Sequence, residues 1–255
     1  MIKFLGRIRQ KLVSEKKLYD YLAYAMGEII LVVLGILIAL QINNWNEDRK
    51  DRREEAAHLQ ELLEDFELNL SRSQRVVSRI EIVIPKLIGL LEQSALEQPT
   101  LPVDSLNQDF TLLQTMPAYT STDRTYNNLI GSGDFKLITH SGLKTAIANY
   151  YGALEVLKLV MATHEMELVN SFQPYIVENL DFQAAFLYRI DDFRLPPPME
   201  ENGILSVLKD RGFRNIITLK VSILSDLLEQ NRNIGKLNGD VVRILKETLP
   251  GSHPD

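Results

Sequence analysis

Residues 21–42 read YLAYAMGEIILVVLGILIALQI, and only Glu28 and Gln41 in this stretch have strongly polar side chains. Roughly 20 apolar residues in a helix are enough to cross the hydrocarbon core of a bilayer. Aromatic residues, whose rings favour the level of the lipid headgroups, flank the apolar run on both sides. They are Tyr19, Tyr21, Tyr24 and Trp45. The stretch therefore predicts one transmembrane helix over residues 21–42.

Two other interpretations exist for an apolar stretch near an N-terminus. A buried helix of a soluble protein normally keeps one polar face, whereas residues 29–40 have no polar side chain on any face. A cleaved signal peptide needs a site with small residues, and here Ala39 is followed by Leu40, Gln41 and Ile42. An uncleaved anchor agrees with both features.

Lysine and arginine residues on the two sides of the stretch favour one orientation. Six lie in the first twenty residues, and four follow at positions 49–53 among five acidic residues. The side with more lysine and arginine tends to stay in the cytoplasm, and acidic residues contribute little to this rule. We therefore expect a cytoplasmic N-terminus and a periplasmic body, with the helix in the inner membrane of a bacterium.

The basic leader, residues 1–20, has two interpretations. Phe4, Ile8 and Leu12 recur at steps of four with basic residues between them, which fits a short helix along the inner leaflet. An unstructured basic tail that only sets the topology would have the same composition. At the other end of the chain, residues 251–255 are expected to be a disordered tail.

Small and polar residues inside the predicted span are candidates for contacts between helices. Four small residues fall at multiples of four positions and share one narrow face, where another backbone can approach closely. They are Ala23, Gly27, Gly35 and Ala39. Glu28 lies beside this face, and its carboxyl either reaches the membrane interface or takes part in helix contacts or proton transfer. Lipid contact alone also explains the small residues, because glycine is frequent in membrane helices.

The sequence of this region resembles that of a known family. GEIILVVLGILIALQINNWNEDRK at residues 27–50, after IRQKLVSEKKLYDYLAYA at 8–25, is similar to the N-terminal signature of an uncharacterised family of single-span bacterial membrane proteins, common in the Bacteroidota. TYNNLIGSGDFKLITHSGLKTAIANYYG, residues 125–152, is similar to the body of that family. The resemblance implies a membrane anchor and implies no activity.

A helical period continues beyond the span. After the charged run NEDRKDRREE, ten positions recur at alternating steps of four and three, and nine of them are apolar. They are Leu59, Leu63, Phe66, Leu70, Ser73, Val77, Ile80, Ile84, Leu87 and Leu91. This period predicts a coiled-coil-like helix that packs either within this chain or between chains. Pro85 is expected to kink or end that helix near Ile84.

Further helices are expected after a break at residues 94–102. Asp104 is a candidate N-cap for a helix through about residue 115, and a short helix over 123–130 leads to a turn at 131–134. Ser141 is a candidate N-cap for a long helix. The inward residues of that helix are expected to be Ala146, Tyr150, Leu154, Leu157, Met161, Leu168 and Phe172.

A second break at residues 191–203 precedes the final helices. Their apolar face is expected to contain Ile217, Val221, Leu224, Leu228, Leu237, Val241 and Ile244. The predicted fold class is all-α: one N-terminal transmembrane helix, followed over residues 43–250 by an antiparallel bundle of long helices.

Composition and motifs exclude several kinds of site. The chain has no cysteine, which rules out disulfides and thiolate metal sites. Of the net charge of −6, the first twenty residues contribute +4, so the remainder carries −10 and does not favour a nucleic-acid partner. The four histidines are isolated, and neither a phosphate loop nor a nucleophile elbow occurs, so we expect no enzyme, cofactor or metal.

A small ligand, if one binds the body, would be expected where irregular backbone meets a long helix. The candidate residues are Asp123, Arg124, Tyr126, Asn127 and Tyr150. The alternative is that the tyrosines pack inside the bundle and Arg124 pairs with a carboxylate.

Three functions agree with these features. The first is a non-enzymatic interaction or scaffold protein, whose partners are the lipid bilayer and either a second copy or another membrane protein. The second is a ligand-sensing subunit, and the third is an oligomeric channel or ion-coupled subunit that uses Glu28.

Overall fold

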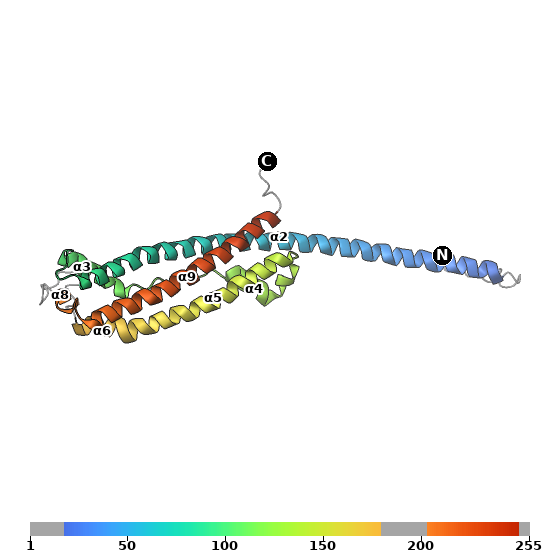
Figure 1. Ribbon diagram of the computed structural model, residues 1–255. Coiled ribbons are helices and arrows are strands. Elements are labelled where there is room, and N and C mark those ends of the chain that lie inside the picture. Colours follow the sequence, from blue (N-terminus) through green and yellow to red (C-terminus); the bar gives the residue numbers. More distant parts are fainter. Residues whose placement is uncertain (1–17, 180–202, 250–255) are drawn as a thin grey trace, which may run out of the picture. The chain divides into compact units, whose positions relative to one another are not determined.

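The computed structural model describes residues 18–179 and 203–249. The described residues form helices joined by turns and extended segments, so the expected all-α class is confirmed. Figure 1 shows them in chain order: α2 (Leu18–Ala95), α3 (Val103–Phe110), η1 (Thr111–Gln114), α4 (Arg124–Ser132), η2 (Asp134–Leu137), α5 (Ser141–Glu167), η3 (Leu168–Phe172), α6 (Gln173–Asn179), α8 (Gly203–Val207) and α9 (Arg211–Thr248). The predicted leader helix, nearly all of the second break and the C-terminal tail lie outside the described residues.

The chain divides into two compact units, residues 1–57 and 58–255, and α2 contributes to both. In the second unit, α9 lies beside α5, and the two helices run in opposite directions (Figure 1). Helix α9 is also antiparallel to α2, because Arg232 pairs with Glu81 at 2.7 Å while the later Lys246 pairs with the earlier Glu67 at 2.6 Å. The long helices of the body therefore pack as a bundle that contains antiparallel pairs, as the helical periods predict.

The buried face of α2 agrees with only half of the predicted apolar positions. Five of the ten predicted residues are fully buried: Leu59, Phe66, Ser73, Ile80 and Leu87. The other five are only half-buried, and the residues just before them are buried more deeply at Leu62, Asn69, Val83 and Leu90. These side chains belong to the core of this chain's own bundle, so the helix packs within the chain.

Pro85 does not end the helix near Ile84, which corrects that part of the expectation from sequence. Helix α2 continues through Pro85 to Ala95. A proline removes the hydrogen bond to the carbonyl four residues earlier, which here belongs to Glu81. Glu81 and Pro85 are both exposed, so water can reach that carbonyl, while Val83 and Leu87 on the opposite face are buried in the core. Packing therefore holds the helix together where local preference would break it.

Several helix ends also differ from the sequence expectations. Helix α3 begins one residue before Asp104, which lies in its first turn, and Pro102 is the N-cap residue. Helix α5 is capped by His140 instead of Ser141, because the His140 Nδ1 accepts a hydrogen bond of 2.9 Å from the Leu143 N–H. The expected turn after α4 is confirmed: Gly133 ends this helix with φ +80°, a left-handed conformation that favours glycine. After the second break the described residues form two helices, the short α8 and the long α9, and the predicted apolar face of the final helices lies on α9.

Candidate functional sites in the apolar helix and the bundle

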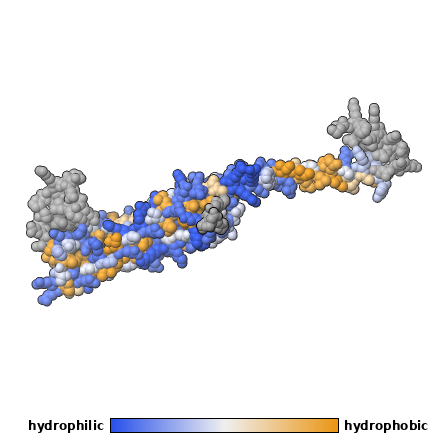
Figure 2. Space-filling view, turned by 90° about the horizontal axis from the view of Figure 1, so that it is seen from above, coloured by the Kyte–Doolittle hydropathy of each residue, from blue (hydrophilic) through white to orange (hydrophobic). Residues whose placement is uncertain are grey.

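The apolar stretch of α2 is exposed along its length. Among the described residues, α2 is the one helix that is long and apolar enough to cross a membrane, and none of its most apolar window is buried in the protein. Figure 2 shows this part of α2 as a hydrophobic stretch next to a strongly hydrophilic band. Since a core helix would be covered by the rest of the chain, the exposed stretch agrees with a lipid-facing helix and not with the core of a soluble protein.

Glu28 and the predicted small residues lie together on this exposed stretch. Ala23, Gly27, Gly35 and Ala39 are all exposed, as is Glu28. Apart from the adjacent residues and the backbone of the same helix, no described atom lies within 4 Å of the position that a Cβ would take at Gly27 or Gly35. The face is therefore open to a neighbouring helix, and its role in association stays a prediction.

Three polar side chains of α2 hold the extended segment that precedes α4, and we call them the polar clasp: Asp65, Asn69 and Arg72. The Asn69 amide donates to the Thr122 carbonyl at 2.8 Å and accepts from the Thr122 N–H at 2.6 Å. Arg72 donates to the Thr120 carbonyl at 3.1 Å and to the Thr122 hydroxyl at 2.7 Å. A segment outside regular structure needs partners for its backbone groups, and the clasp supplies them.

Asp65 completes the clasp at the start of α4. Its carboxylate accepts a hydrogen bond of 3.1 Å from the backbone N–H of Thr125 in the first turn of α4. Such an N–H has no partner within its own helix, and a negative charge there is favourable to the helix dipole. No side-chain cap comes from Asp123 itself, the residue at the N-cap position, so Asp65 takes this role from another helix.

An aromatic cluster lies next to the polar clasp. Phe66 packs edge-on against Tyr150 and Tyr151, with ring centroids 5.0 and 6.4 Å apart, and Tyr151 stacks on Tyr126 at 3.9 Å. The Tyr150 hydroxyl lies 2.8 Å from that of Tyr119. Burial raises the pKa of Tyr150 and of Tyr151 well above the ordinary range, so both remain neutral phenols. The cluster joins α2, α4 and α5 into one packed unit.

The structure divides the residues that were predicted to bind a ligand into two groups. Tyr126 and Tyr150 belong to the aromatic cluster, and Asp123 is half-buried at the N-cap position of α4. Arg124 and Asn127 are exposed on α4. The packing of the tyrosines matches the alternative interpretation, and ligand binding here stays a prediction.

Sequence reasoning missed the clasp residues on α2. Asp65 and Asn69 are buried on that helix, and a polar residue at a buried position normally has a hydrogen-bond partner elsewhere in the fold. Neither residue lies at a position of the predicted apolar period, so little in the sequence indicates that the two side chains are buried. The sequence also could not identify the partner, because Thr122 lies 53 residues away in the sequence from Asn69.

A second buried polar pair joins α5 to α9. The Lys220 Nζ lies 2.6 Å from the His164 Nε2 and 4.7 Å from the ring centre of Phe172, and both Lys220 and His164 are fully buried. Burial lowers the pKa of Lys220 to about 7, and burial together with the charge of Lys220 lowers the pKa of His164 to about 4. Near neutral pH the pair therefore consists of a neutral imidazole and a lysine that readily loses its proton.

The described residues include no group of three histidine, cysteine or carboxylate side chains that could hold a metal ion. The hydrogen-bonded neighbour of His164 is Lys220, which is not one of the residue types that such a group requires.

Comparison with known proteins identifies the family. A model described as a family of unknown function, DUF6090, matches residues 28–170, which is more than half of the chain. The chain belongs to the DUF6090 family. The expectation of an uncharacterised family is thereby confirmed, whereas its bacterial range stays a prediction. The DUF6090 match contains Glu28, the polar clasp, the aromatic cluster and His164, and it ends before Lys220. No curated protein and no solved structure matches the chain.

Proposed function

We propose that the protein is a membrane-anchored, non-enzymatic interaction or scaffold protein whose helical body lies in the periplasm of a bacterium. One observation carries the proposal: the apolar part of α2 is exposed throughout, and the same helix continues as the first helix of the bundle. A stretch of this length and composition would be insoluble as a free surface, so a bilayer is its natural environment. The anchor thus holds a folded body at a membrane.

The orientation rests on the six lysine and arginine residues before the stretch, against four close behind it. An alkaline phosphatase reporter, which is active only after export, is expected to be active when it is fused after Glu55. The chain should also stay with the membranes when they are washed at high salt or high pH. Activity of a cytoplasmic reporter at the same position would contradict the proposed orientation. Release of the chain by the washes would contradict the proposed membrane anchor.

Self-association through the small-residue face is the interaction that the open surface supports best. Replacing Gly27 and Gly35 together by leucine should weaken self-association of the full chain in detergent or bilayers by about tenfold, equivalent to ~1.4 kcal/mol. Leucine side chains would hold two backbones apart where close approach is needed. Energy transfer between labelled copies, or the mass of the detergent-solubilised protein, measures the change.

Two further variants test this interaction. Val33→Leu adds similar bulk on another face of the same helix and should leave self-association unchanged. Glu28→Gln should also leave it unchanged in a scaffold, whereas a channel or proton-coupled subunit would lose ion or proton movement in reconstituted vesicles. If the glycine variants associate as tightly as the natural chain, the small-residue face is not the contact.

A further inference from the structure

The charged run that follows the apolar stretch is sorted by helix face. NEDRKDRREE, residues 46–55, contains four basic and five acidic residues, so its overall charge is nearly balanced. On a helix, however, Trp45, Arg49, Arg52 and Ala56 recur at steps of four, three and four and share one face, with Arg53 at its edge. Most of the carboxylates fall elsewhere, with Glu47, Asp51 and Glu54 on the opposite face. The net charge of the run is therefore close to zero, although one face of α2 is basic.

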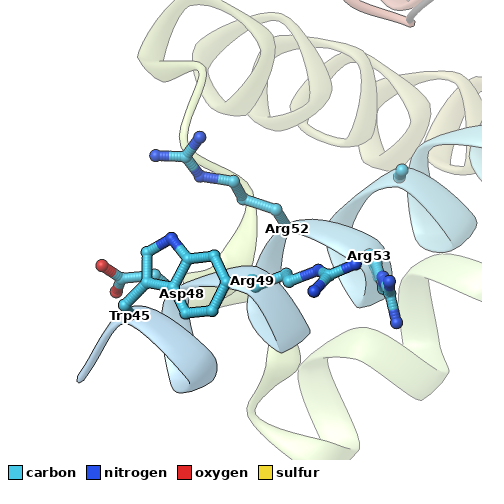
Figure 3. Close-up of a pocket in the computed structure, with 6 residues that line it drawn as sticks. Trp45, Asp48, Arg49, Arg52 and Arg53 are labelled. Carbon is cyan, nitrogen blue, oxygen red and sulfur yellow. The ribbon is translucent and has the colours of Figure 1, made fainter. Parts of the chain in front are cut away.

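The basic face surrounds an open pocket. The pocket has a volume of about 450 Å³ and is lined by Trp45, Asp48, Arg49, Arg52, Arg53 and Ala56. Figure 3 shows these side chains projecting from α2, with the Arg52 guanidinium reaching away from the helix. The guanidinium carbon of Arg49 lies 5.8 Å from the centre of the Trp45 ring, and this ring is 64% exposed. An indole and three guanidinium groups thus border one hollow.

Among the described residues, the arginines of this face have no carboxylate in an ion pair with them. On the opposite face, Lys50 pairs with Glu54 at 3.6 Å. None of Arg49, Arg52 and Arg53 forms an ion pair with a carboxylate in the part of the chain that the structure describes. Asp48 supplies the single carboxylate of the pocket lining, which leaves a surplus of two positive charges. The pocket is therefore complementary to an anion.

The position of the face relative to the apolar stretch identifies the anion. Trp45 lies three residues beyond Ile42, at the level where indole rings favour the headgroups. At 1.5 Å per residue, Arg49 to Arg53 follow at about 6 to 12 Å from Trp45 along the axis. Helical side chains tilt toward the N-terminus, which here is the direction of the apolar stretch, so long arginine side chains can reach back to the headgroup layer.

We propose that Trp45, Arg49, Arg52 and Arg53 form a binding site for the headgroup phosphate of anionic phospholipids at the edge of the bilayer. Guanidinium groups bind phosphate oxygens through two parallel hydrogen bonds, and the indole packs against the upper acyl chain or glycerol. An acidic protein segment is the competing partner. Lipid is favoured, because the pocket is continuous with the apolar stretch and includes the aromatic residue at its border. This inference rests on the proposed function, since it requires the stretch to cross a membrane.

The test uses Trp45, the only tryptophan of the chain, as a built-in reporter. The full chain is reconstituted in phosphatidylcholine vesicles that contain phosphatidylglycerol, and Trp45 fluorescence is quenched by brominated acyl chains carried by one lipid or the other. Brominated phosphatidylglycerol should quench more strongly than brominated phosphatidylcholine at equal mole fraction, with a relative association on the order of tenfold for several arginines. This preference should fall as salt is raised.

Matched variants assign the preference to the basic face. Arg52→Gln with Arg53→Gln removes two charges that do not touch the Trp45 ring and should reduce the preference at least about threefold. Lys50→Gln removes one charge at nearly the same depth on the opposite face and should leave the preference unchanged.

The possible failures are distinguishable. Equal quenching by the two lipids, or a preference that survives the double arginine variant, would overturn the lipid site while leaving the anchor in place. A double variant that keeps the lipid preference but releases an acidic protein would overturn it in favour of the protein partner. If neither brominated lipid quenches Trp45, the result would contradict the proposed membrane anchor, on which this inference rests.

Discussion

Replacing Phe66 by alanine is expected to lower the free energy of unfolding of the bundle by about 3 to 5 kcal/mol, the range for removing a large aromatic side chain from a core. Phe66 is 1% exposed and touches the rings of both Tyr150 and Tyr151. Edge-on aromatic pairs contribute about 0.5 to 1.5 kcal/mol beyond the buried area. The loss should also loosen the polar clasp, because Asp65 is adjacent and Asn69 lies one turn later on the same helix.

The measurement is chemical unfolding of the full chain in detergent, followed by far-ultraviolet circular dichroism, with the near-ultraviolet signal reporting the tyrosines of the cluster. Leu68→Ala is the matched control: Leu68 lies two residues along the same helix and is 43% exposed, so its loss should cost about 1 kcal/mol or less. If Phe66→Ala and Leu68→Ala destabilise the chain equally, the aromatic cluster is not the structural centre of this end of the bundle.

The element types in this fold could be predicted from sequence, because they depend on patterns within one helix. The apolar stretch at residues 21–42 has no polar face, and the long periods after it belong to helices wherever they pack. The continuation through Pro85 could not be predicted in this way. It depends on which side of α2 the core lies, and only the packing of the other helices of the bundle decides that.

The predicted buried faces of α9 and α2 differ from the observed ones because polar residues occupy some of the core positions. In α9 the most deeply buried positions follow alternating steps of four and three: Phe213, Ile217, Lys220, Leu224, Leu227, Asn231, Ile234, Asn238, Val241 and Leu245. A search for apolar residues alone avoids the lysine and the two asparagines. It then selects neighbours such as Val221, Leu228 and Leu237, which are only half-buried.

The prediction for α2 also selected an apolar neighbour in place of a buried polar residue: Asn69 is fully buried, and Leu70 beside it is half-buried. A strict alternation of steps that admits a polar residue is therefore a better guide to these helices than an unbroken apolar run. Of these polar core residues, Asn69 belongs to the clasp and Lys220 to the His164–Lys220 pair. The partners of these two residues come from distant parts of the chain, so no spacing within one helix reveals them.

Lys220 should make the stability of the bundle depend on pH between about 7 and 10.5. Its pKa is about 7 in the folded chain and 10.5 as the ordinary value in the unfolded chain. Within this window the unfolded chain holds a proton that the folded chain has released, so the free energy of unfolding rises with pH. The gain between pH 7 and about pH 9 should be about 2 kcal/mol for a single group with this shift. His164, with its pKa lowered to about 4, acts in the same direction at lower pH, between about 4 and 6.5.

Replacing Lys220 by methionine should abolish this gain, because methionine fills similar space without a group that titrates. Lys236→Met, on the exposed side of the same helix, is the matched control and should keep the natural slope. The comparison is best limited to pH 9 and below, since the buried tyrosines begin to act in the opposite sense where unfolded tyrosine ionises, near pH 10.

A Lys220→Met chain whose stability still rises by about 2 kcal/mol over this range would mean that Lys220 keeps its proton inside the bundle. A flat profile would show instead that the contact with the His164 Nε2 is made by a lysine that is neutral above pH 7. The pair would then be a hydrogen bond between two neutral groups, which a bundle core tolerates far better than an isolated buried charge.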